Sequence, residues 1–189
     1  MSKVIGLTGP TGSGKSTLSA VAEACGFRVL NCDLIARRAV EPGMPGLAAV
    51  TAAFGQDILE KDGRLNRKAL AAKAFSSPEQ TERLNRTLLP HIVRMVKAEA
   101  VGQDTLLDAP TLFESGIDRM CQTTIALLAK EEIRLHRIML RDGLSEEEAL
   151  LRVRAGKPDA YYIERADHIL FNNGDLAVLQ KQFRQIIAE

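Results

Sequence analysis

The chain has 189 residues, 25 basic and 24 acidic, so its near-zero net charge gives no electrostatic case for binding nucleic acid or a membrane surface. Trp is absent and the three cysteines are scattered, which argues against a base-stacking platform, a disulfide framework and a zinc site. The chain opens directly on a predicted strand and has no apolar run of the roughly 18–20 residues that a membrane span needs. We therefore expect a soluble, cytoplasmic protein, and we expect it to be a monomer.

The first predicted strand, Val4–Thr8, leads into the segment Gly9-Pro10-Thr11-Gly12-Ser13-Gly14-Lys15-Ser16-Thr17 and then into an Ala-rich helix. This arrangement satisfies G-x-x-x-x-G-K-[ST] between a strand and a helix, the pattern of a phosphate-binding loop. Glycines allow the backbone to curl and point its N–H groups at phosphate oxygens, while the lysine supplies positive charge and the following hydroxyl suits Mg2+. We predict that a nucleoside triphosphate is bound by Gly12, Ser13, Gly14, Lys15, Ser16 and Thr17.

A second strand is predicted at 27–31, and Cys32 and Asp33 follow it immediately. Chemistry in α/β sheets gathers at the carboxyl ends of the strands, so Asp33 should lie near the phosphate-binding loop. An aspartate at this boundary is equally suited to capping a helix over 34–40. The two roles are compatible, and the position alone leaves both open.

Residues 41–46 contain two prolines and two glycines and mark the exit from the nucleotide core. Helices are predicted at 47–54, at 67–75 and from Ser77 onward, with Pro90 expected to kink or break the last one. Such a helical insertion between strands usually holds the second substrate. Most of its basic side chains, among them Arg67, are expected to be solvated, with one or two contacting an anionic substrate.

A third strand from Thr105 carries Asp108 near its end, where P-loop proteins often hold magnesium or its water. The run 123–129 is continuously apolar, as a parallel strand buried on both faces should be, and a fifth strand is predicted at 168–172. Alternating strands and helices predict a three-layer α/β fold, the P-loop NTPase fold, with a five-stranded parallel sheet.

Between the fourth and fifth strands we predict a helix at 131–141 and another that begins with a capping box at Ser145. Arg134, Arg137 and Arg141 recur at spacings of three and four, which gathers them towards one side of the first helix. A basic helical hairpin opposite a phosphate loop would suit a closing lid. The alternative is a solvated face of arginines and glutamates.

Taken together, these segments resemble the dephospho-coenzyme A kinase family over nearly the whole chain. The most particular match is Asp33-Leu34-Ile35-Ala36-Arg37 followed by Glu41-Pro42-Gly43. The other matching segments are 5–9 with 12–17, 62–65 with Arg67, 110–114, 141–145, 166–168 and 172–174. The resemblance implies ATP-dependent phosphorylation of the ribose 3′-hydroxyl of dephospho-coenzyme A, which gives coenzyme A and ADP in the last step of coenzyme A biosynthesis.

The resemblance also implies roles for individual residues. Asp33 matches the proposed general base, Lys15 and Arg141 would hold the transferring phosphoryl group, and Asn173 would lie beside the adenine of ATP. The metal is expected at Ser16 and Asp108, and the acceptor at Asp33, Arg67, Leu112, Phe113 and Glu114. The chain would divide into a nucleotide core (about 1–41, 104–130 and 166–189), a substrate-binding insertion (about 42–103) and a lid (about 131–165).

Several positions depart from the family pattern. Asn31 and Asn66 replace usual acids, Pro90-His91 reverses a usual order, and Gly156 and Tyr161-Tyr162 fall at or near a usual glutamine and lysine. Two alternatives stay open: another small-molecule or nucleotide kinase of the P-loop superfamily, and a nucleotide-binding switch. Against the switch, the chain has no Asn-Lys-x-Asp base-reading motif and carries its lid arginines in cis.

Overall fold

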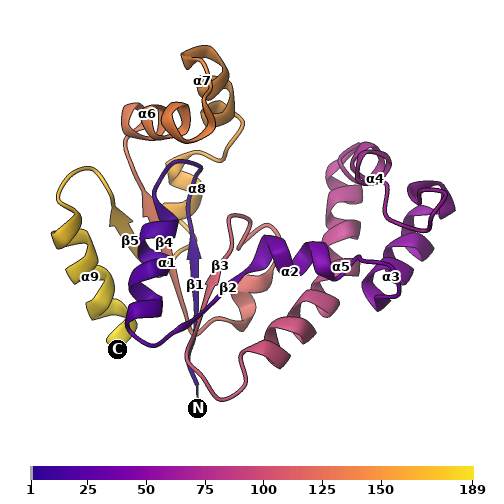
Figure 1. Cartoon of the computed structure of the whole chain (residues 1–189), viewed down its shortest axis with the longest axis horizontal. Coiled ribbons are helices and arrows are strands. Elements are labelled where there is room, and N and C mark those ends of the chain that lie inside the picture. The colour runs from indigo at the N-terminus through magenta and orange to yellow at the C-terminus, as the bar shows by residue number, and fades with distance from the viewer. Residues whose placement is uncertain (1) are drawn as a thin grey trace.

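Within residues 2–189, which the computed structural model describes, five strands form a parallel sheet in the order β2-β3-β1-β4-β5 (Figure 1). The strands are β1 (Val4–Thr8), β2 (Arg28–Asn31), β3 (Thr105–Asp108), β4 (Thr123–Leu128) and β5 (His168–Phe171). Leu7 of β1 is in register with Asp108 of β3 and with Ile125 of β4, so the carboxyl ends of the central strands meet at one edge. The predicted α/β fold with a five-stranded parallel sheet is confirmed.

The strands are connected by helices whose bounds are α1 (Lys15–Ala24), α2 (Cys32–Arg38), α3 (Pro45–Phe54), α4 (Arg67–Ala74), α5 (Pro78–Glu99), α6 (Glu131–Asp142), α7 (Glu146–Arg154), α8 (Asp159–Ile163) and α9 (Leu176–Ala188). Two short 3₁₀ segments, η1 (Gln56–Ile58) and η2 (Ile117–Met120), complete the connections. None of the helices in the described part of the chain is long and apolar enough to cross a membrane.

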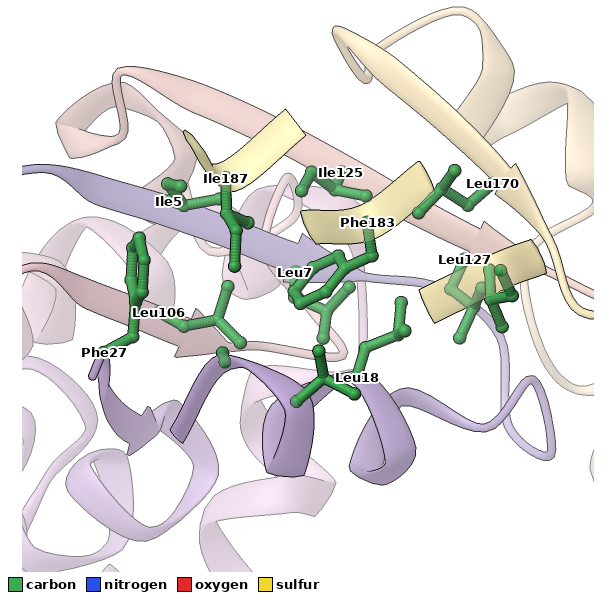
Figure 2. Close-up of a cluster of buried hydrophobic side chains, with 13 residues drawn as sticks. Ile5, Leu7, Leu18, Phe27, Leu106, Ile125, Leu127, Leu170, Phe183 and Ile187 are labelled. Carbon is green, nitrogen blue, oxygen red and sulfur yellow. The ribbon is translucent and has the colours of Figure 1, made fainter. Parts of the chain in front are cut away.

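One face of the sheet is covered by α1 and α9. Figure 2 shows Leu7 and Leu127 from the strands facing Leu18 of α1 and Phe183 of α9, all within one buried hydrophobic cluster. The other face packs against α2, the end of α5 and η2. The sheet is thus the middle of three layers, because its strands carry apolar side chains on both faces.

The helices α3, α4 and the first half of α5 lie to one side of the sheet and share a second hydrophobic core (Figure 1). α5 continues through Pro90 without interruption, so of the predicted kink or break at this residue the break is wrong. A proline removes one backbone hydrogen bond of a helix. Both halves of α5 are held by packing: Leu88 contacts the second core, while Ile92 and Val96 are buried beside the sheet.

Candidate active site

The loop between β1 and α1 has the shape that its glycines were predicted to allow. Gly12 and Gly14 have positive φ values of 79° and 98°. A Cβ atom on Gly14 would lie 2.4 Å from Nδ2 of Asn172, and one on Gly12 would lie 2.8 Å from the carbonyl oxygen of Arg134. The two glycines are therefore required by close neighbours of the loop as well as by its backbone conformation.

Two groups in this loop are suited to an anion. The Lys15 Nζ donates a hydrogen bond to the Gly9 carbonyl oxygen over 2.9 Å, and burial lowers the pKa of the amine despite the nearby charges of Asp108 and Asp33. The buried Ser13 hydroxyl has no hydrogen-bond partner among residues 2–189. Together with the N-terminus of α1, which starts at Lys15, these groups fit the phosphates of a nucleotide.

A cavity of about 620 Å³ opens over the loop at the carboxyl edge of the sheet. It is lined by loop residues including Gly12, Gly14, Lys15, Ser16 and Thr17, by Asn31 and Asp108 from the strand ends, by Arg137 and Arg141 of α6, and by Asn172. The sequence-predicted phosphate loop, Asp108 and Arg141 are thus brought together. Figure 1 shows α6 and α7 standing beyond this edge of the sheet.

Two residues hold the loop in place: Arg137, which the sequence analysis named only among the arginines of a lid, and Asn172, which it did not assign to the site. Arg137 donates from Nη1 to the carbonyl oxygens of Gly12 (3.3 Å) and Ser13 (3.1 Å), and from Nη2 to that of Asn172 (3.4 Å). The buried Asn172 donates from Nδ2 to the Ser13 carbonyl oxygen over 2.8 Å. The recurrence of arginines along α6 indicated Arg137 as a lid residue, but it did not predict these bonds to the backbone of the loop.

Asn173, expected beside the adenine, lies next to this network. Its side chain is exposed, and its Oδ1 accepts a hydrogen bond from the Lys130 backbone N–H over 2.7 Å, at the start of α6. It lines a separate, smaller hollow with Phe171 and Val178. The buried contact with the phosphate loop is made by its neighbour Asn172.

Arg141 is on the exposed side of the lid hairpin formed by α6 and α7. Its guanidinium donates to both carboxylate oxygens of Asp142 over 2.7 and 2.8 Å, and this bond raises its pKa. Arg152 of α7 donates to the same carboxylate over 2.5 Å. The conformation seen therefore has Arg141 held by its neighbour at the rim of the cavity.

The two acids of the strand ends differ in their surroundings. Asp108 is partly buried, accepts a hydrogen bond from the Ser19 hydroxyl over 3.3 Å, and has a pKa raised by burial. Asp33 is exposed in the first turn of α2, near enough for its charge to act on Lys15 and Asp108. In the described chain, no three His, Cys, Asp or Glu side chains are arranged to hold a metal by themselves.

The capping role considered for Asp33 is wrong. The N-cap of α2 is Asn31, whose Oδ1 accepts from the Leu34 N–H over 3.0 Å. Asn66 caps α4 in the same way, through the Ala69 N–H at 2.9 Å. Both asparagines that replace usual acids therefore cap a helix through their side-chain oxygen, and Asp33 does not cap α2.

The residues expected to bind the acceptor lie outside the nucleotide cavity. Arg67 is exposed at the first position of α4, in the helical arm. Leu112 is fully buried, and a Cβ on Gly6 would lie 2.8 Å from it, so its side chain belongs to the core and offers no surface to a substrate. Phe113 packs edge-on against Tyr161, and the Glu114 carbonyl oxygen accepts from Asn85 of α5 over 2.7 Å.

Comparison with known proteins shows which family the chain resembles. The family model described as dephospho-CoA kinase matches residues 3–178. A dephospho-CoA kinase from Corynebacterium efficiens is 42% identical over 98% of this chain and 96% of its own length. The solved structure of a dephospho-CoA kinase from Campylobacter jejuni has a TM-score of 0.63 and 26% identity, covering 100% of this chain and 97% of that one.

A crystal structure of a Thermus thermophilus protein is also similar, with a TM-score of 0.77 and 35% identity over 99% of this chain and 97% of that chain. The family match and the identity to curated relatives both extend over nearly the full length. The phosphate loop and the strand-end acids fall within the matched residues. The chain belongs to the dephospho-CoA kinase family.

Proposed function

We propose that this protein transfers the γ-phosphoryl group of ATP to the ribose 3′-hydroxyl of dephospho-coenzyme A. The observation that carries the proposal is the 620 Å³ cavity, in which a phosphate-binding loop faces two arginines of α6 at the edge where Asp108 ends β3. In phosphoryl transfer the protein mainly positions the reactants and stabilises charge on the transferring group, and this cavity offers the groups for both tasks.

On the donor side, the backbone of Gly12 to Thr17 and the free Ser13 hydroxyl would bind the phosphates, with Lys15 at the β- and γ-positions. Arg141 would leave Asp142 and turn towards the γ-phosphate. Its present partner Asp142 is also bonded by Arg152, so this carboxylate keeps an ion pair when Arg141 leaves. The exchange therefore costs little compared with a charge-assisted bond to phosphate.

We propose that Mg2+ is held at Ser16 and Asp108. Both residues line the cavity, and magnesium commonly takes one or two protein oxygens, with waters and substrate phosphates as its other ligands. The raised pKa of Asp108 fits this assignment, since a partly buried carboxylate is disfavoured in its charged form until a cation joins it. When bound, the ion would neutralise charge on the β- and γ-oxygens.

On the acceptor side, Asp33 would orient the ribose hydroxyl and take its proton. Its carboxylate is exposed, free of capping duty and within electrostatic reach of Lys15. We propose that Arg67, Phe113 and Glu114 help to bind the acceptor when the helical arm (about 42–103) and the lid (about 131–165) close around it. The cytoplasmic, monomeric state stays a prediction, and light scattering on the purified protein tests the monomer.

The test is an assay of ADP release with Mg2+-ATP and dephospho-coenzyme A. Turnover should exceed that with pantetheine or nucleosides; equal rates on another small acceptor would indicate a different kinase, and stimulation by a protein partner alone would indicate a switch. Asp33→Asn should lower kcat by ~10²–10⁴ and leave ATP affinity nearly unchanged. Asp104→Asn, at the opposite edge of the sheet where Asp104 accepts from the Lys3 N–H, is the matched control.

Equal losses of ATP affinity and kcat in Asp33→Asn would contradict the role of Asp33 as the base. A loss of kcat of the same size in Asp104→Asn would show that the loss of any carboxylate lowers turnover. The lowered kcat of Asp33→Asn would then no longer support Asp33 as the base.

A further inference from the structure

Ser19 lies one helical turn after Lys15 on α1 and contacts the acid that ends β3. Its hydroxyl is within hydrogen-bond distance of Oδ2 of Asp108, at 3.3 Å, and of the Lys15 carbonyl oxygen, at 3.2 Å. Asp108 and Ser16 line the nucleotide cavity, whereas Ser19 lies outside the lining that the structure describes. Ser19 is therefore placed to act on the cavity through Asp108.

The backbone of Asp108 is held on both sides, but its side chain is not. Asp108 is in register with Leu7 of β1 and with Asn31 of β2, between two parallel neighbours. The next N–H, that of Ala109, donates to the Leu7 carbonyl oxygen over 3.0 Å. Among residues 2–189, the hydrogen bond to the Asp108 carboxylate comes from Ser19 alone. The direction of this carboxylate therefore depends on the Ser19 hydroxyl.

The hydroxyl has one hydrogen to share between its two acceptors. Both distances exceed the ~2.7–2.8 Å typical of a bond from a hydroxyl, as expected when one hydrogen is shared. The Lys15 carbonyl is inside α1 and has the N–H four residues on as its helical donor. A hydrogen bond to an ionised acceptor is also stronger than one to a neutral acceptor. The hydroxyl therefore matters more to Asp108 than to the helix.

We propose that Ser19 is the positioning residue of Asp108: its hydroxyl holds Oδ2 and so keeps the carboxylate directed at a divalent cation that binds with the nucleotide. This inference deepens the proposed function, since it rests on the assignment of Mg2+ to Ser16 and Asp108. Residues that orient a metal ligand typically change metal affinity or activity by about 10–100-fold when they are replaced. The alternative is a serine that only bonds back to its own helical turn and has no effect on the cation.

Calorimetric titration with ATP, once in Mg2+ and once in EDTA, separates the two roles without measuring turnover. In Ser19→Ala the Kd for ATP in EDTA should stay within ~2-fold of the parent, because the Lys15 carbonyl keeps its helical donor. In Mg2+ the Kd should rise ~10-fold, the lower end of the range for residues that orient a metal ligand. An equal rise in Mg2+ and in EDTA would overturn the proposal, as would a parent whose Kd does not depend on Mg2+.

A second pair of variants isolates the hydroxyl from the size of the side chain. Ser19→Thr keeps the hydroxyl, and Ser19→Val replaces it with a methyl group on a side chain that is also branched at Cβ. Ser19→Thr should bind ATP in Mg2+ at least ~5-fold more tightly than Ser19→Val, and the two should bind alike in EDTA. Equal Kd values in Mg2+ would overturn the proposal.

Ser76→Ala is the matched control. Ser76 is exposed, and in the described chain its hydroxyl donates only to a backbone carbonyl, that of Lys73, over 2.7 Å. Both Kd values for ATP should stay within ~2-fold of the parent, because water can replace the lost donor. A rise in Mg2+ equal to that of Ser19→Ala would overturn the proposal, since any lost serine hydroxyl would then have the same effect.

A double-mutant cycle tests whether Ser19 acts through Asp108. With Asp108→Asn in place, adding Ser19→Ala should change the Kd for ATP in Mg2+ by less than ~2-fold, because the charged acceptor is already gone. A further rise of ~10-fold in that background would mean that Ser19 acts elsewhere, and it would overturn the proposal.

This proposal and the proposed function fail in different measurements. If the parent does not phosphorylate dephospho-coenzyme A, the proposed reaction fails, while the titrations with ATP still decide the role of Ser19. If the parent phosphorylates dephospho-coenzyme A and Ser19→Ala binds ATP in Mg2+ as the parent does, the reaction stands and the positioning role is overturned.

Discussion

The two adjacent asparagines after β5 give a sharp test of how the phosphate loop is held. Asn172 is 6% exposed and donates to the Ser13 carbonyl oxygen over 2.8 Å, and its Nδ2 is close to Gly14. Asn173 is exposed and bonds only the start of α6, through Lys130. We predict that Asn172→Ala damages both stability and ATP binding, and that Asn173→Ala affects them slightly.

The size of the effect follows from the bonds that are lost. A buried hydrogen bond contributes about 1 ± 0.5 kcal/mol, and an acceptor left unpaired costs about 1–3 kcal/mol. The Ser13 carbonyl oxygen keeps Arg137 at 3.1 Å, so the loss should be near the lower end, about 1–2 kcal/mol. For a chain of this length, that lowers the Tm by about 2–8 °C. If the loosened loop loses ~1.4 kcal/mol of phosphate binding, the Kd for ATP rises ~10-fold.

Thermal unfolding followed by circular dichroism gives the Tm, and isothermal titration calorimetry with Mg2+-ATP gives the Kd. In Asn173→Ala, water can replace the lost acceptor at Lys130, so the loss of stability should stay below ~1 kcal/mol. An Asn173→Ala variant that equals or exceeds Asn172→Ala in both measurements would refute the reasoning and favour a role for Asn173 at the nucleotide.

Two further predictions concern the same site. Burial raises the pKa of Asp108 above its unfolded value near 3.8, so the protonated form favours folding, and that contribution is lost as the pH rises through the folded-state pKa. Asp108→Asn should therefore raise the Tm at pH 7, and the difference in Tm from the parent should shrink towards pH 3.8. The same variant should weaken Mg2+-dependent turnover. A lower Tm than the parent at pH 7 would contradict the inference that the charged Asp108 side chain destabilises the fold. Gly14→Ala should destabilise the protein more than Gly43→Ala in urea unfolding. Both glycines have positive φ, so both variants carry the same kind of backbone strain. Only a Cβ on Gly14 also meets a neighbour, Asn172 Nδ2 at 2.4 Å. Equal losses in the two variants would mean that backbone strain alone matters.

The strand–loop–helix order made most of the fold predictable from the sequence. Apolar runs such as that of β4 mark parallel strands buried on both faces, and the phosphate-loop motif fixes the end of β1. The break considered at Pro90 does not occur, because packing on both halves of α5 offsets the local cost of the proline. Tertiary contacts decide such cases, and they are invisible in a single sequence.

The missed role of Asn172 has a local cause as well. Side chains alternate between the two sides of a strand, and here Leu170 is 5% exposed, Phe171 56% and Asn172 6%. Strict alternation from a buried Leu170 would have placed Asn172 inward. Because the outward-facing Phe171 is apolar, the sequence does not show an alternation of apolar and polar residues here. The sequence therefore did not indicate which of the two asparagines points inward.

The arginines of α6 are distinguished by their bonding partners, which sequence spacing does not reveal. Arg137 is bonded to three backbone carbonyl oxygens of the loop and of Asn172, so moving it would break three hydrogen bonds at once. Arg141 is bonded only to Asp142, a carboxylate of its own hairpin that Arg152 also bonds, so Asp142 keeps a partner when Arg141 moves. A fixed arginine can shape a site in advance, whereas a weakly held one can move towards charge as it develops. Arg137 is therefore the better candidate for holding the loop, and Arg141 for meeting the transferring phosphoryl group.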